Sequence, residues 1–355
     1  MKHRFVLTLS ALLVGACLLT GCATAPRTAS NTTLISDPSA RPRLALTRET
    51  EDRILALNPE RVSAQEVSEI LSNLPAPRVI NIHGGIYPVY LAMKSFSLFL
   101  VGMGYPATNI CNPGNGKYSF SCYTSSDKIA GAVAWYYEHE PLRPVLVGHS
   151  QGGMQVVKVL YKLSGSSTDQ LKVWNPLTRK YEPRTVIRDP LTGEPTPVVG
   201  LRLPYASAVG AGGFTRLLPN QWEMLGRLRK IPNSVEDFTG FSMGFDLFGG
   251  DLLGFGPWNE YAAKGTAQVR NVRLPIGDNH VTVPVTKHLL KSQQIKDWIN
   301  AYSPSADPKP KVKFDSSSTH IVWAADVWYS LKQHWVLELQ RVIRAQRAQT
   351  PRHEP

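Results

Sequence analysis

The chain has 355 residues, of which 43% are hydrophobic, so it can bury one large core or two smaller ones. Its 39 lysines and arginines exceed its 27 aspartates and glutamates, which gives a formal net charge of +12. These basic residues are scattered and form no dense run interleaved with aromatic residues. The sequence therefore does not indicate a nucleic-acid-binding protein.

Residues 1–21 have the pattern of a secretory signal peptide. A basic start at residues 2–4 precedes an apolar stretch, 5–20, that is short for a membrane span. The residues LTGC at 19–22 resemble the lipobox of bacterial lipoproteins. That resemblance implies cleavage before Cys22, lipidation of its thiol and an anchor in the bacterial envelope, at the outer membrane because no aspartate follows Cys22. An ordinary signal peptide cut nearby is the alternative.

The remaining organisation is read from composition and periodicity. A tether over 22–50, rich in Ser, Thr, Pro and Arg, precedes a single domain over 51–347 and a tail at 348–355. From residue 78 onward, strand-like and helix-like segments alternate, which predicts a mostly parallel sheet flanked by helices. The expected strands are 78–82, 107–111, 144–148, 198–213 and 267–275. The expected helices are 90–104, 125–140, 154–163, 217–230, 285–302 and 321–347.

Two segments interrupt this alternation. Residues 165–197 are polar and rich in proline and turn signals, which indicates a surface excursion or hairpin. Residues 214–262 combine aromatic residues with glycines. This composition is typical of a mobile cap that lines an acyl-chain pocket, although a packed core segment with turns would look the same.

Two cysteines lie within the predicted domain. Cys111 and Cys122 are eleven positions apart in a loop rich in Gly, Asn and Ser. An even pair in an exported protein predicts a disulfide between them. The loop offers too few further ligands for a metal site, and no cofactor-binding motif is present elsewhere in the sequence.

The residues GHSQG at 148–152 fit the pattern G-x-S-x-G. An apolar strand precedes them and an amphipathic helix follows, and glycines at 148 and 152 suit a turn too sharp for side chains. Upstream, NIHGG at 81–85 follows another expected strand. Together these motifs resemble the lipase and esterase branch of the α/β-hydrolase superfamily. The resemblance implies a nucleophile at Ser150 and an oxyanion site formed by backbone N–H groups near Gly85 and at Gln151.

In that superfamily an acid and then a histidine follow the serine along the chain. Asp246 and His280 are one candidate pair: Asp246 ends the alternating segment 238–246, and His280 follows the strand expected over 267–275. Asp278 and His320 are the other, with the histidine directly before the last helix. We favour Asp246 and His280, because the strand that the second pair needs would be short and charged, but the sequence leaves both pairs open.

The resemblance implies a lipid-anchored serine hydrolase that cleaves carboxylic esters through an acyl-enzyme. Its partners would be a small-molecule or lipid ester and the membrane that holds the anchor, with no metal or cofactor. An acyltransferase with the same triad and a non-catalytic envelope lipoprotein are the alternatives. We expect His149 and His83 to serve packing, and the oligomeric state stays open.

Overall fold

The structure, a computed structural model, describes residues 44–166, 170–211, 219–246, 248–249, 260–275, 278–304 and 320–349. The predicted signal peptide and Cys22 lie outside these residues, as does most of the tether. Within these ranges no helix combines the length and apolarity that a membrane crossing requires.

A six-stranded sheet forms the centre of the fold, and every neighbouring pair of its strands is parallel. The strand order is β12-β10-β8-β3-β1-β2. In that order the strands are Gln268–Arg273, Val235–Ser242, Leu203–Val209, Val145–His149, Val79–His83 and Phe120–Ser121. The central strand β3 is buried along its whole length, as its unbroken apolar run predicts. The predicted α/β character with a parallel sheet is confirmed.

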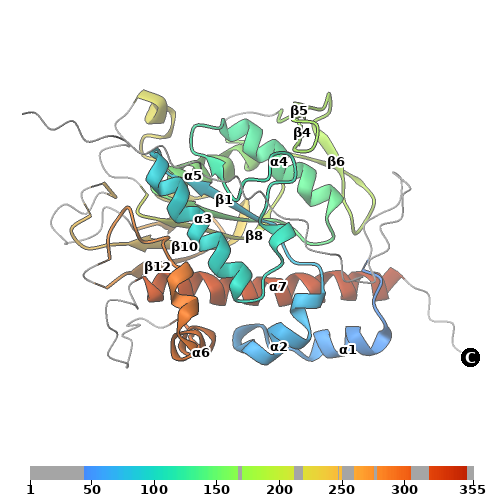
Figure 1. Ribbon diagram of the computed structural model, residues 1–355. Coiled ribbons are helices and arrows are strands. Elements are labelled where there is room, and N and C mark those ends of the chain that lie inside the picture. Colours follow the sequence, from blue (N-terminus) through green and yellow to red (C-terminus); the bar gives the residue numbers. More distant parts are fainter. Residues whose placement is uncertain are drawn as a thin grey trace, which may run out of the picture.

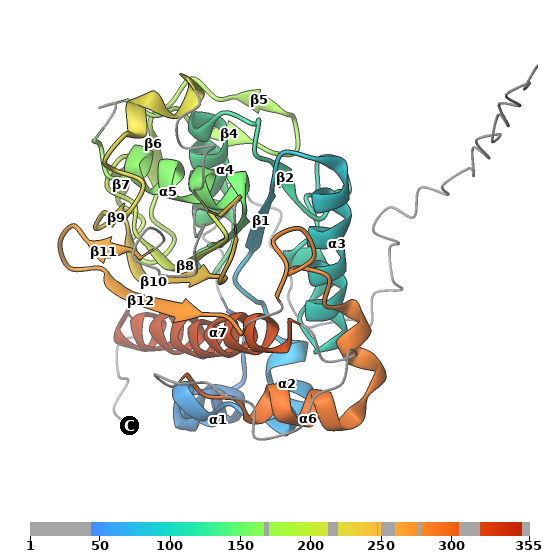
Figure 2. The ribbon, with the colours of Figure 1, turned by 90° about the vertical axis from the view of Figure 1, so that its left-hand side faces the viewer.

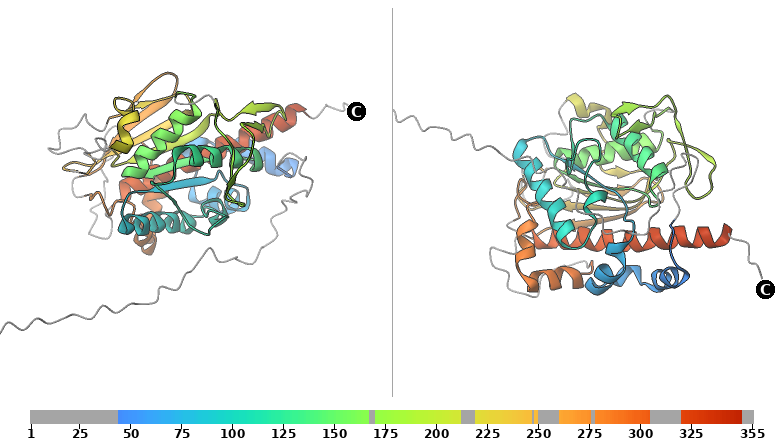
Figure 3. Two further views of the ribbon diagram at one scale, coloured as in Figure 1. Left: turned by 90° about the horizontal axis from the view of Figure 1, so that it is seen from above. Right: turned by 45° about the vertical axis from the view of Figure 1, so that its right-hand side comes forward.

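Helices cover both faces of this sheet, as Figures 1 and 2 show. The α-helices are α1 (Arg48–Ala56), α2 (Ala64–Glu69), α3 (Tyr87–Gly102), α4 (Ser126–His139), α5 (Gln151–Leu163), α6 (Gln293–Ala301) and α7 (Ile321–Gln349). Alternate residues of the strands point to opposite faces, so Val79 packs with α3 and α7 while Ile80 packs with α4 and α5. Helices α4 and α5 lie side by side (Figure 3), and α1, α2 and α6 cover the outer side of α7.

The polar segment 165–197 contains two short hairpins, in agreement with its prediction as an excursion. The first pairs β4 (Trp174–Asn175) with β5 (Lys180–Tyr181), and the second pairs β6 (Val186–Arg188) with β7 (Pro195–Pro197). Two further short strands, β9 (Lys230–Ile231) and β11 (Ala262–Ala263), form a small parallel pair.

The prediction of a cap over 214–262 is wrong for its middle part. Residues Val235–Ser242 are strand β10, which pairs with β8 and β12 inside the main sheet. Phe238 and Phe241 are buried in the two cores on either side of it. Phe238 and Phe241 therefore serve the core, as the alternative held, whereas Phe245 and Phe248 are exposed. Residues 214–218, 247 and 250–259 lie outside the described part.

Three local predictions also differ from the structure. Residues Ala107–Asn109 form a 3-10 helix, η3, rather than a strand. The helix expected over 217–230 is limited to the 3-10 helix η5 (Pro219–Met224), because Gly226 has a positive φ of 75° that ends helical geometry. The helix expected over 285–302 is divided at Ser292, which caps α6 and separates it from the 3-10 helix η7 (Lys287–Lys291).

The predicted disulfide between Cys111 and Cys122 is wrong. Cys122 has a free, buried thiol that packs in the core beside α4 and α5. Cys111 is disulfide-bonded, but its partner is not among the described residues. The two cysteines lie toward opposite ends of β1: the Cys111 carbonyl accepts from Arg78, just before β1, whereas Cys122 follows the strand that pairs with the far end of β1. A disulfide requires the two Cα atoms to lie within about 7 Å of each other. Closeness in sequence does not bring the Cα atoms of these two cysteines together, because the chain between them runs along β1.

Helix α7 brings charged side chains into the interior, and two of its buried carboxylates pair with arginines, Asp326 with Arg270 and Glu338 with Arg143. Glu338 accepts from the guanidinium of Arg143, with the shortest N–O distance at 2.6 Å, and Arg143 also pairs with Glu236. Burial alone would raise the pKa of Glu338, but the hydrogen bonds and charge of Arg143, with Arg341, lower it to about 2. This network fixes α7 against the amino ends of the strands.

We predict that Glu338→Gln destabilises the protein by about 3 kcal/mol at neutral pH, because it leaves Arg143 without its buried partner. The lowered pKa of Glu338 makes its contribution complete above its usual pKa of 4.5 and lost as the pH falls toward about 2. Urea unfolding at a series of pH values should therefore show the deficit of the variant shrinking below pH 4.5. Glu194→Gln, at an exposed loop position, is the control. A deficit that does not depend on pH would contradict the account.

Candidate active site

Ser150 lies at the centre of the carboxyl edge of the sheet. The chain runs from β1 outward to β2 and then returns to β3 on the other side of β1. This reversal is a topological switch point, where open α/β sheets hold their ligands. Ser150 follows β3 and Gly84 follows β1, so both sides of the switch point carry residues that the sequence singled out.

A sharp turn between β3 and α5 presents the Ser150 side chain at this edge. Ser150 has φ 56° and ψ −128°, a conformation that non-glycine residues rarely adopt. The turn brings helix α5 against the strands so closely that a Cβ at Gly152 would lie 2.1 Å from the carbonyl oxygen of Ile82. A Cβ at Gly148 would lie 2.5 Å from the carbonyl oxygen of Gly152. The predicted need for glycine at both positions is confirmed.

His280 reaches Ser150 from the loop that follows β12. Its Nε2 lies 2.8 Å from the Ser150 Oγ, and its Nδ1 lies 2.8 Å from Oδ2 of Asp246. Because a carboxylate can only accept, Nδ1 carries the proton and Nε2 is free to accept from the serine hydroxyl. The ring is buried, whereas Ser150 is partly exposed.

Asp246 comes from the loop after β10 and is itself well supported. Its side chain is buried, and Oδ1 accepts from the backbone N–H of Gly249 at 2.7 Å. The preceding residue, Phe245, has φ 60°, an unusual value for a bulky side chain. Strained backbone thus occurs at the two loops that carry Ser150 and Asp246.

The other candidate pair, Asp278 and His320, also forms, but it does not contact Ser150. The Nδ1 and the backbone N–H of His320 both donate to Oδ1 of Asp278, at 2.9 and 3.2 Å. Both side chains are buried. His320 directly precedes α7, so this pair ties the loop that carries His280 to the start of that helix.

Backbone from the loop after β1 packs directly on the serine. A Cβ at Gly84 would lie 2.9 Å from the Ser150 Cβ, and one at Gly85 would lie 2.7 Å from the side-chain oxygen of Gln151. Nδ1 of His83 donates to the Gly84 carbonyl at 2.8 Å, which orients the peptide that bears the Gly85 N–H. Within the described residues neither the Gly85 N–H nor the Gln151 N–H has an acceptor. The structure thus places these two predicted residues beside Ser150.

Three supporting residues complete the surroundings. His149 is fully buried, and its Nε2 donates to the carbonyl of His280 at 2.6 Å, so its packing role includes holding the backbone of that loop. Gly210 and Tyr123 were not predicted from the sequence. A Cβ at Gly210 would lie 3.0 Å from Nδ1 of His280, and the Tyr123 hydroxyl donates to the Gly85 carbonyl at 3.1 Å. Gly210 follows β8, and its place at a strand end was the one available signal.

No metal-binding group of three or more His, Cys, Asp or Glu side chains occurs in the described ranges. Comparison of the chain with models of known protein families found no match, and a search among curated proteins likewise found none.

We predict that His149 stays neutral well below the pH at which exposed histidines titrate. Burial, followed by the nearby positive charge that His280 can carry, lowers its pKa to about 3. Nitrogen-15 NMR should find the neutral ring, protonated on Nε2, at about pH 5 as at about pH 8. Unfolding frees this imidazole to bind a proton below its usual pKa of 6.5, so its burial lowers stability as the pH falls below that value. Titration near 6.5 in the folded protein would refute the assignment.

Proposed function

We propose that this protein is a serine hydrolase with an α/β-hydrolase fold that cleaves carboxylic esters through an acyl-enzyme. One observation carries the proposal: an unbroken line of hydrogen bonds joins Ser150, His280 and Asp246 at the switch point of a parallel sheet. These three groups are a nucleophile, a base and the carboxylate that orients the base.

In the proposed reaction, Nε2 of His280 accepts the hydroxyl proton as the Ser150 Oγ attacks the ester carbonyl. Asp246 holds the ring in the tautomer that leaves Nε2 free, and its charge stabilises the imidazolium that forms. The imidazolium then returns the proton to the departing alcohol, and the acyl group remains on Ser150. A water molecule, activated by the same imidazole, releases the acid and restores the hydroxyl.

The negative charge that develops on the carbonyl oxygen needs donors that are already in place. The N–H groups of Gly85 and Gln151 are suited to this role, because both lie beside Ser150 and neither has an acceptor among the described residues. His83 donates to the Gly84 carbonyl and Tyr123 donates to the Gly85 carbonyl. These two hydrogen bonds limit the movement of Gly85.

Exposed apolar side chains next to the site favour an ester with apolar substituents. Ile86 follows Gly85, the hydroxyl of Tyr123 contacts Gly85, and the ring of Phe248 lies 5.6 Å from that of His280. Each of these three side chains is more than half exposed. Large apolar side chains left in water around a polar centre are typical of a ligand-binding site.

The same surroundings argue against a non-catalytic scaffold. A buried carboxylate and imidazole aligned on a serine in strained backbone cost stability, and a protein that only binds has no use for that cost. Anchoring through a lipid on Cys22 stays a prediction from the sequence, because that residue lies outside the described part of the chain.

The test is labelling with a fluorophosphonate probe, which reacts with activated serines. We expect one adduct per chain on Ser150, and none in Ser150→Ala. His280→Ala should slow labelling by at least about a hundredfold, because the base is lost. His320→Ala, matched in chemistry and also paired with an aspartate, should label within a few-fold of wild type once its melting temperature has been checked.

Two outcomes would overturn the proposal. An unlabelled Ser150 in the folded wild-type protein would remove the nucleophile. Labelling that survives in His280→Ala but is lost in His320→Ala would transfer the role of the base to the other pair.

A further inference from the structure

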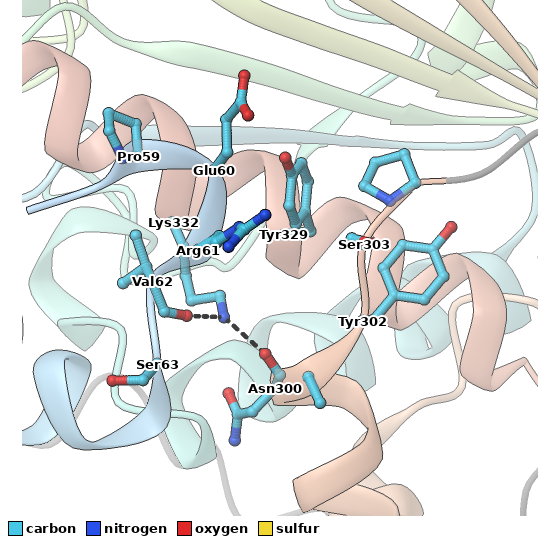
Figure 4. A pocket seen from close by; sticks show the side chains of 12 residues that line it. Pro59, Glu60, Arg61, Val62, Ser63, Asn300, Tyr302, Ser303, Tyr329 and Lys332 are labelled. Atoms are coloured by element: carbon cyan, nitrogen blue, oxygen red, sulfur yellow. Dashed lines mark hydrogen bonds between the residues drawn. The ribbon is translucent and has the colours of Figure 1, made fainter.

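A cavity of about 660 Å³ is bounded by η1 (Pro59–Arg61), the end of α6 and one face of α7 (Figure 4). None of the residues that surround Ser150 lines it. We call this space the η1–α6 cavity. The lining residues that determine its chemistry are Glu60, Arg61, Asn300, Tyr302, Tyr329 and Lys332.

Lys332 supplies a buried positive charge to this cavity. The residue is 2% exposed, and its Nζ donates to the carbonyls of Val62 and Asn300 at 2.5 and 3.2 Å. An ammonium group has three N–H donors, and the third has no acceptor in the described part of the chain. No described carboxylate lies within 4.0 Å of this nitrogen, and besides the two carbonyls it has the ring of Trp328, whose centroid lies 5.8 Å away. A buried charge usually requires an opposite charge as its partner.

Arg61 adds a second cation to the same space. Its guanidinium is exposed and makes no ion pair with any residue that the structure describes. Figure 4 shows it directed toward the space that Lys332 lines, with the rings of Tyr329 and Tyr302 beyond it. Among the lining residues Glu60 is the one carboxylate, so two positive charges face a single negative one.

The capping of two helix ends does not account for this arrangement. The carbonyls of Val62 and Asn300 lie at the ends of η1 and α6, and a neutral donor would satisfy them. Burial lowers the pKa of Lys332 to about 8, with Glu66 opposing the shift, so the charge is held at a cost. An anion in the cavity would remove that cost and would also pair with Arg61.

We propose that the η1–α6 cavity binds a small organic phosphate, whose oxygens are held by Lys332 and Arg61. The oxygens of a phosphate accept hydrogen bonds from several directions, so one phosphate can bind both the buried Lys332 and the exposed Arg61. The rings of Tyr302 and Tyr329 form an apolar wall for the organic part, and the volume of the cavity leaves room for it.

Calorimetric titration of the full chain with phenyl phosphate tests the proposal. We expect phenyl phosphate to bind more tightly than inorganic phosphate, which lacks the ring, and phenol to show no binding. Lys332→Met should weaken phenyl phosphate by about tenfold or more, and Arg61→Gln by about fivefold. Glu60→Gln should strengthen it, because the opposing charge is removed.

Controls separate the site from general charge effects and from the proposed hydrolase. Arg53→Gln removes an exposed arginine outside the cavity and should leave binding unchanged. Ser150→Ala should also bind as wild type does, so that the two proposals succeed or fail independently. If Lys332→Met does not fold, Arg61→Gln and Glu60→Gln still test the proposal, because both positions are exposed. The first variant should weaken phenyl phosphate binding and the second should strengthen it.

A soluble compound and a lipid head group are the two sources of such a phosphate, and sedimentation with vesicles distinguishes them. Capture by phosphatidic acid in phosphatidylcholine vesicles, lost in Arg61→Gln, would assign a lipid phosphate. The absence of binding to both phenyl phosphate and these vesicles would overturn the proposal. So would binding that none of the cavity variants changes.

Discussion

The close approach of α5 to β1 and β3 is the constraint on which the site depends. The carbonyl of Ile82 occupies the space that a side chain at Gly152 would need, so the helix can begin only one residue after the strand ends. Ser150 is therefore forced into a backbone conformation with positive φ and stands at the sheet edge instead of in the core. Gly84 meets it from β1 for the same reason, since any side chain there would collide with the serine.

The parallel sheet then determines which residues can reach Ser150. All six strands end at one edge, so the loops after β10 and β12 deliver Asp246 and His280 to the same place. The second Asp–His pair fixes the loop of His280 to α7, and α7 is in turn fixed to the sheet by the buried charges of Arg143 and Glu338. The position of the imidazole is thus connected to the interior of the molecule through the hydrogen bonds between Asp278 and His320 and the ion pair between Arg143 and Glu338.

Much of this arrangement could be predicted from sequence because it depends on neighbours along the chain. The apolar run of β3, the glycines at 148 and 152 and the helix after them are local, and they predict both the strand and the turn. The choice between the two Asp–His pairs could not be made in that way, because both pairs exist and only three-dimensional proximity to Ser150 separates them. The prediction of the disulfide failed for a related reason. Cys111 and Cys122 are only eleven positions apart in sequence, but in the structure they lie toward opposite ends of β1.

Replacement of each aspartate by asparagine tests the central claim most directly. Asparagine preserves the size of the side chain but removes the charge that holds the histidine tautomer. If Asp246 serves His280, Asp246→Asn should lower kcat for a nitrophenyl ester by about 10³ to 10⁴-fold, whereas Asp278→Asn should stay within about tenfold of wild type. A collapse of kcat in Asp278→Asn, with Asp246→Asn close to wild type, would contradict the account.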